Sequence, residues 1–203
     1  AVNAALEDVP AFASMKKYAP EVHRSISKTM LDAIDRGMPA QQASLLVRGQ
    51  VQNFVSTRLP NASDTALVAY VGVMTEEMGA LQAAGNGMCF QFMFPASAGG
   101  VDVSKSISKE TQNKDLAALD EIVKSSNTHR APPQQNEVMP YMQPIFIALR
   151  DKYGDGITVL EHPEAPGVDR EKVCNMTRDL YTKILALPTG QAGAGLRWMF
   201  SQK

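Results

Sequence analysis

Residues 63–87 read SDTALVAYVGVMTEEMGALQAAGNG and contain the signals that begin, continue and end one amphipathic helix. Ser63 or Asp64 can cap the start, because a short oxygen-bearing side chain accepts a hydrogen bond from a free backbone N–H of the first turn. Apolar residues then recur every three or four positions, at Leu67, Val68, Tyr70, Val71, Met74, Met78 and Leu81. Gly85-Asn86-Gly87 follows, and these residues tolerate the left-handed backbone that ends many helices. The stretch predicts a long helix with one buried face.

The residues before this stretch predict two more helices. The first covers residues 20–36, with Pro20 at its first position and Gly37 directly after its end. The second begins at Pro39 and ends before Pro60, because the residue that precedes a proline is disfavoured in the α region. Short connections join the three helices, which predicts antiparallel packing.

The middle of the chain is less regular. The alternating aromatics of residues 89–95 would suit a short strand, but their position after a helix break favours a short buried helix. Residues 96–105 contain Gly99-Gly100 and few apolar side chains, so they predict an exposed connection and a candidate sub-boundary. Residues 108–126 carry one apolar stripe, which predicts a surface helix packed on one side only.

The last third contains another helical pattern at residues 135–153, but Pro140 and Pro144 fall inside it. This helix should therefore start near Pro140 or be kinked there. Residues 155–167 predict a short strand or an irregular loop, because a short apolar run is followed by turn-forming prolines and glycine.

Two helices are expected at the C-terminal end. Asp169 caps the first, which stops before Pro188, and Thr189 caps the second. Together these patterns predict an all-α chain: a single globular domain over residues 1–203, with about seven to eight antiparallel helices and at most a minor β element.

Composition and charge exclude several classes of protein. The 203 residues are 44% hydrophobic, and 20 Lys and Arg balance 21 Asp and Glu to a formal net charge of -1. Near neutrality leaves no clustered basic surface for a phosphate backbone, so we expect no nucleic-acid partner. The longest apolar run, residues 65–74, is about half the length that a membrane helix needs, so we expect no membrane span within this chain.

Cys89 and Cys174 are the only cysteines and form no C-x-x-C pair. Two buried free thiols are one interpretation. We favour a disulfide, because an even count with wide separation is typical of an oxidising compartment. The chain begins Ala1-Val2 without Met, which signal-peptide cleavage, removal of the initiator Met or truncation would each produce. Both observations favour an extracytoplasmic location, periplasmic or secreted.

No catalytic motif emerges from the sequence. The three histidines have no metal-ligand spacing, so we expect no metal and no cofactor. Glu161-His162-Pro163-Glu164 is the nearest thing to a general-base cluster, and we interpret it as a solvated loop. The glycines of residues 190–195 do not follow the order of a phosphate-binding loop, and we interpret them as sites of close helix packing.

Arg197, Trp198 and Phe200 are the candidate partner-binding residues, because Trp and Arg are typical anchors of protein interfaces. The alternative, which we favour for Trp198, is burial of its side chain in the core of the same domain. We therefore expect a non-catalytic, extracytoplasmic protein-interaction domain (an inhibitor, adaptor or envelope-assembly partner) whose partner is another protein. An apolar-ligand or lipid carrier is the alternative, motivated by 11 Met and 7 Phe. An enzyme whose site is assembled from distant residues is the third hypothesis.

Overall fold

The computed structural model describes residues 9–98 and 101–202, so Ala1-Val2 and Gly99-Gly100 lie outside the described residues. The elements in chain order are α2 (Pro10–Tyr18), α3 (Pro20–Asp35), α4 (Ala40–Arg58), η1 (Leu59–Asn61), α5 (Asp64–Ala84), α6 (Met88–Met93), α7 (Pro95–Ala98), η2 (Val103–Lys105), α8 (Lys109–Ser125), α9 (Gln135–Tyr153), η3 (Gly154–Glu161), α10 (Arg170–Leu185) and α11 (Thr189–Ser201), where η marks a 3-10 helix. These two ranges contain no strand. The all-α prediction is confirmed.

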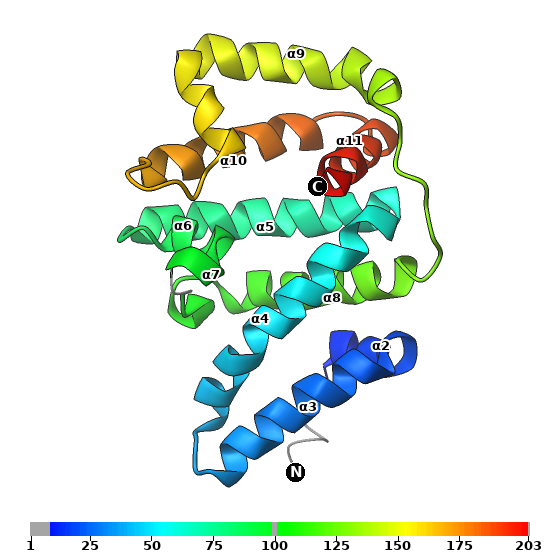
Figure 1. Ribbon diagram of the computed structural model, residues 1–203, viewed down its shortest axis with the longest axis vertical. Helices are drawn as coiled ribbons and strands as arrows, with labels where there is room; N and C mark the ends of the chain where they lie inside the picture. Colours follow the sequence, from blue (N-terminus) through cyan, green and yellow to red (C-terminus); the bar gives the residue numbers. More distant parts are fainter. Residues whose placement is uncertain (1–8, 99–100, 203) are drawn as a thin grey trace.

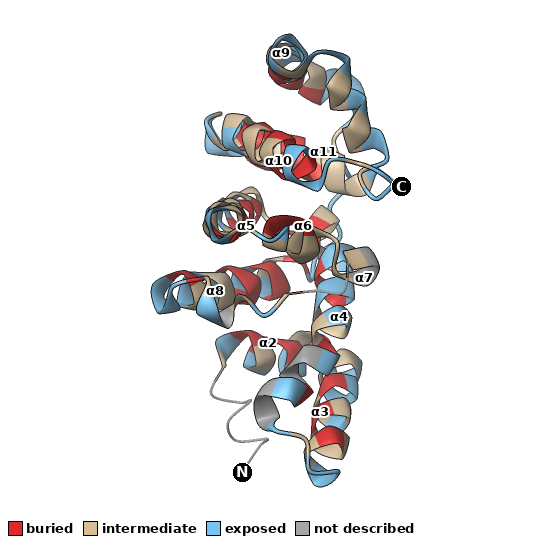
Figure 2. Cartoon of the chain, turned by 90° about the vertical axis from the view of Figure 1, so that its left-hand side faces the viewer, coloured by how far each residue is buried: buried red, intermediate tan, exposed pale blue. Residues whose placement is uncertain are grey.

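The helices form a stack of layers along the long axis of the molecule (Figures 1 and 2). Helix α3 lies at one end with α2 beside it, α8 and α5 follow, and α10 with α11 and finally α9 form the other end. Helix α4 runs obliquely from the end with α3 past α8 to the start of α5. The buried sides of the helices face neighbouring layers in Figure 2. One cluster of buried side chains includes residues of α2, α5, α8, α9 and α11, so a continuous core joins the layers.

The predicted helix ends match the structure where a specific side chain sets them. Ser63 accepts a hydrogen bond from the backbone N–H of Ala66, and Asp169 accepts one from that of Lys172. Gly37 follows α3 with a φ of 85°, in the left-handed region that glycine adopts without steric conflict. Capping chemistry therefore fixes these boundaries.

Helix α2 was not predicted. Its nine residues begin at Pro10, and they bury Ala11, Ser14 and Met15. Its partner is α8, where the Ser14 hydroxyl donates a 2.5 Å hydrogen bond to buried Asp120. The prediction that α8 packs on one side only is therefore wrong, because α2 covers one side of it and α5 another.

Three smaller differences concern local backbone. Helix α9 runs through both Pro140 and Pro144 instead of starting near Pro140. The segment predicted as a strand or irregular loop forms η3, a 3-10 helix. The N-cap of α11 is Pro188, so Thr189 is the first helical residue and not the cap.

Cys89 and Cys174 form a disulfide, as predicted, and it ties α6 to α10 across a Cα–Cα distance of 6.2 Å. The pair belongs to a second buried cluster with Met78, Leu81 and Ile107. The bond therefore fixes α6 at one end of the long helix α5. In this position α6 forms one wall of a pocket.

Candidate functional site: a pocket between α4, α5, α6 and α8

A pocket of about 210 Å³ lies between four helices. Its lining contains Arg48, Val51, Gln52 and Val55 from α4, Tyr70, Met74 and Glu77 from α5, Phe92 and Met93 from α6, and Asp115 and Leu119 from α8. Apolar, thioether and aromatic side chains make most of this wall, and two carboxyl groups and one guanidinium are the charged groups. Apolar walls with a few convergent polar groups are typical of small-molecule sites.

Glu77 is the most unusual residue of the pocket. Its relative exposure is only 4%, although a buried carboxylate normally has charged or hydrogen-bonding partners. Within residues 9–98 and 101–202 the structure shows no hydrogen bond to its side chain. Burial, and to a smaller extent the neighbouring charge of Asp115, raise its pKa from 4.5 to about 8, and Arg48 opposes this shift. Near neutral pH the group is therefore largely protonated.

Asp115 and Tyr70 share this environment. Burial raises the pKa of Asp115 above its ordinary value, and the charge of Arg48 opposes the shift. Burial also raises the pKa of the Tyr70 phenol, and the charges of Asp115 and Glu77 add to this effect. Such a cluster of acidic groups with shifted pKa values in a cleft is typical of functional sites.

Arg48 already has partners in the protein. Its guanidinium donates a hydrogen bond to the backbone carbonyl of Val101, and it lies 6.0 Å from the centroid of the Phe92 ring. These contacts hold the cation at one side of the pocket, so it neutralises the two carboxyl groups only in part.

We expect Glu77→Gln to remove a pH dependence of stability. Because the folded chain holds this proton more tightly than the unfolded chain does, the contribution of Glu77 is greatest below about pH 4.5 and is lost as the pH rises toward 8. Glutamine resembles the protonated form, so the variant should exceed the wild type by on the order of 3 kcal/mol at about pH 9 and match it near pH 5. Urea unfolding at both pH values measures this, and parallel pH profiles would contradict it.

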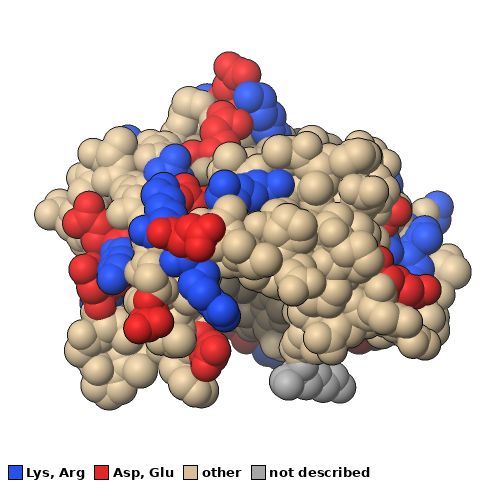
Figure 3. Space-filling model, turned by 90° about the horizontal axis from the view of Figure 1, so that it is seen from above, with Lys and Arg blue, Asp and Glu red and all other residues tan. Residues whose placement is uncertain are grey.

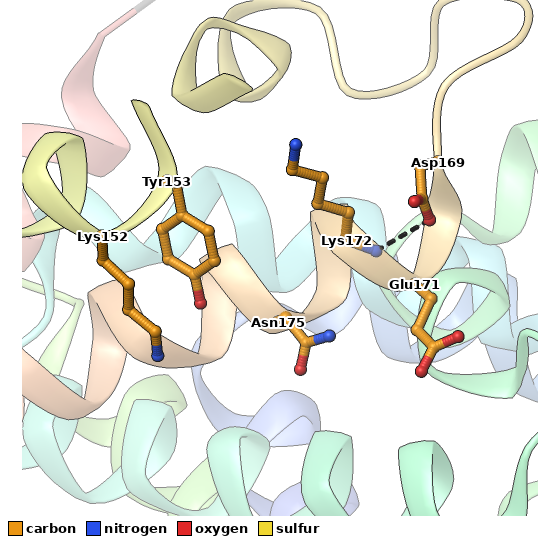
Figure 4. A pocket seen from close by; sticks show the side chains of 6 residues that line it. All are labelled: Lys152, Tyr153, Asp169, Glu171, Lys172 and Asn175. Atoms are coloured by element: carbon orange, nitrogen blue, oxygen red, sulfur yellow. Dashed lines mark hydrogen bonds between the residues drawn. The ribbon is translucent and has the colours of Figure 1, made fainter. Parts of the chain in front are cut away.

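A second, wider groove lies between η3 and the start of α10, where two adjoining hollows of about 440 and 410 Å³ share Asp169 and Lys172. Figure 4 shows that the side chains around the first hollow point in different directions and do not converge. Lys152 and the Tyr153 hydroxyl both bind Asp179 instead. His162, from the cluster considered in the sequence, is exposed and lines the second hollow. We therefore take the pocket between α4, α5, α6 and α8, and not this groove, as the candidate site.

The structure places the three candidate partner-binding residues in different environments. Arg197 is 8% exposed, and its guanidinium bonds to Asp64 and, at 3.0 Å, to the carbonyl of Ala62. Trp198 and Phe200 are partly buried against the main core. A role for these residues in partner binding stays a prediction, and the internal salt bridge already occupies Arg197.

Trp198→Ala should lower the free energy of unfolding by about 2 kcal/mol, because a partly buried aromatic loses part of the contribution of a fully buried one. Gln191→Ala, at an exposed position of the same helix, is the control and should have little effect. Chemical denaturation followed by the fluorescence of this single tryptophan gives both values. An unchanged denaturation midpoint for Trp198→Ala would contradict the expected contribution of this side chain to the stability of the core.

No metal centre is evident in the described ranges, where no group of three His, Cys, Asp or Glu side chains could hold an ion. Those ranges also contain no helix long and apolar enough to cross a membrane.

The pocket residues were missed, although the sequence contains a signal for them. Glu77 follows Tyr70 and Met74 and precedes Leu81 at helical spacing, so it lies on the apolar face of α5. Asp115 precedes Leu119 and Ile122 in the same way on α8. An acidic residue within an apolar stripe is the feature that could have identified the site.

The chain has no match among known protein families, among curated proteins or among solved structures.

Proposed function

We propose that this chain is a non-catalytic binding domain that works outside the cytoplasm and holds a small molecule in the pocket between α4, α5, α6 and α8. The observation that carries the proposal is the pocket itself: about 210 Å³ with apolar walls and with Glu77, Asp115 and Arg48 as its charged groups. This combination supports the carrier hypothesis, with polar groups that would orient the ligand.

Binding is favoured over catalysis by the chemistry of the lining. Among the described residues that line the pocket there is no Ser or Thr hydroxyl, Cys thiol, His imidazole or Lys amine. These are the groups that most often act as nucleophiles or general bases in enzymes. The carboxyl groups could transfer protons, but a binding role needs no further group.

The extracytoplasmic part of the proposal is supported by the disulfide between Cys89 and Cys174. Disulfides persist in oxidising compartments and are rare in the cytosol of most organisms. The sulfur atoms are buried, with relative exposures of 3% for Cys89 and 1% for Cys174, which is typical of a structural bond rather than a redox-active one.

A protein partner is the second candidate, supported by the outer surface of α9. Its exposed residues from Asn136 to Ile147 are almost all uncharged, and Ile147 is 52% exposed. Figure 3, which looks onto this end of the molecule, shows a broad area without charged residues beside a region of mixed charge. Photo-crosslinking from position 147 in the native host, with exposed position 151 as control, would test for such a partner.

The pocket hypothesis is tested with three ring compounds of similar size: benzylamine, benzyl alcohol and benzoate. We expect saturation-transfer NMR to detect binding of at least one of them with millimolar affinity, as is usual for fragments. Gln52→Trp places a large ring at the exposed mouth of the pocket and should abolish the signal. Asn53→Trp, at the next residue of α4 and outside the lining, should leave the signal unchanged. Binding that survives Gln52→Trp, or no binding of any probe, would refute the hypothesis.

A further inference from the structure

The pocket lining contains more acidic than basic groups. Two carboxyl groups, Glu77 and Asp115, line it together with one cation, Arg48. That cation already donates to the carbonyl of Val101 and lies over Phe92. When both carboxyl groups are ionised, the lining carries one uncompensated negative charge.

Glu77 adds a second, independent observation. It is more than nine-tenths buried and lines the cavity, and within the described ranges no donor reaches its carboxyl group. A largely buried carboxyl group without a protein donor is poorly solvated, so its charged form is unfavourable. A ligand that supplies both a donor and a positive charge would remove this penalty.

The uncharged side chains of the lining suit the apolar part of such a ligand. Phe92 and Tyr70 offer aromatic rings, whose faces attract organic cations. Met74 and Met93 are flexible and polarisable, so they adapt to an apolar body. A metal ion is disfavoured, because two carboxyl groups beside a guanidinium make a poor ligand set and the described residues contain no group of three metal-ligating side chains.

We infer that the pocket takes a small organic cation, a protonated amine with a compact apolar body, whose ammonium group lies between the carboxyl groups of Glu77 and Asp115. This inference rests on the proposed binding function and adds the chemical class of the ligand.

The binding should depend on pH through Glu77. The titratable groups that face it are Arg48 of α4, Glu76 and Tyr70 of α5 and Asp115 of α8, and α6 contributes only uncharged side chains to the lining. A bound ammonium favours the carboxylate, so the protein must lose a proton when the ligand binds below the pKa of Glu77. Affinity for an amine should therefore rise by up to about tenfold between pH 6 and pH 8.

The test compares benzylamine with benzyl alcohol and benzoate, which have the same ring but a neutral or a negative polar group. We expect benzylamine, which is protonated at pH 6 and at pH 8, to bind at least about tenfold more tightly than either at pH 8. Glu77→Gln and Asp115→Asn should each reduce this preference by about tenfold. Glu121→Gln, which removes one exposed charge from α8, is the matched control and should retain the preference.

The outcomes separate the two proposals. If benzyl alcohol or benzoate binds in the pocket as tightly as benzylamine, the cation inference fails and the pocket function stands. A benzylamine preference that persists in both Glu77→Gln and Asp115→Asn also overturns the inference, because the ammonium would then lie elsewhere. If none of the three probes binds, both proposals fail.

Discussion

Replacing Gly193 by leucine should lower the free energy of unfolding by about 4 kcal/mol or more, because α11 then has no room against α5. A Cβ atom at this position would overlap the Cβ of Asp64 and lie 2.5 Å from its Cα, a separation that non-bonded Cβ atoms essentially never show. The backbone of Asp64 cannot move aside as a flexible side chain would, so the helices must separate. Separation would expose buried Leu196 and disturb the salt bridge between Arg197 and Asp64.

Gly190→Leu is the matched control for this substitution. Gly190 is exposed in the first turn of the same helix, and a Cβ there would meet nothing within 4 Å. The control should unfold within about 0.5 kcal/mol of the wild type. Urea unfolding of both variants measures the difference, and equal stabilities would show that α11 does not approach α5 this closely.

Removing the disulfide should lower the free energy of unfolding by a similar amount. Cys89 and Cys174 are 85 residues apart in the sequence, so their bond closes a long loop and restricts the unfolded chain. The double variant Cys89→Ala/Cys174→Ala should lose about 4 kcal/mol of stability under oxidising conditions. Reduced wild type should unfold at nearly the same denaturant concentration as the double variant.

Thiol titration provides the control for that experiment. The denatured, unreduced protein should contain no titratable thiol, since both cysteines are bonded. Two titratable thiols, together with a double variant as stable as the wild type, would contradict the disulfide and remove the support for an extracytoplasmic location.

Much of the fold could be predicted because the deciding interactions are local. Ser63 and Asp169 cap helices through hydrogen bonds to residues three positions along the chain, and a single sequence contains both partners. The prolines and glycines between helices act through their own backbone in the same way. These features explain why the all-α class and most helix boundaries were predicted.

The larger errors occur where distant residues decide the structure. Helix α2 is short, and its buried Ser14 bonds to Asp120 more than a hundred residues later. The same long-range contact places α8 between α2 and α5. Its apolar stripe by itself is typical of a surface helix. Sequence periodicity cannot show which two stripes will meet.

The candidate site was missed for the same physical reason. Glu77 and Asp115 lie on different helices, and although each stands within an apolar stripe, the sequence does not show that the two stripes meet. Only the packing of α5 against α8 brings both into one pocket with Arg48. The disulfide pair, in contrast, could be predicted, because two cysteines allow only one intramolecular pairing.

The most direct test of the binding pocket uses the methyl groups of methionine as reporters. Met74 and Met93 line the pocket, whereas Met30 and Met142 are buried in the main core and do not line it. We expect addition of benzylamine to Met-methyl-labelled protein to shift the NMR signals of Met74 and Met93 in a saturable way, and to leave those of Met30 and Met142 in place. Unchanged Met74 and Met93 signals at a probe concentration of several millimolar would contradict the central claim.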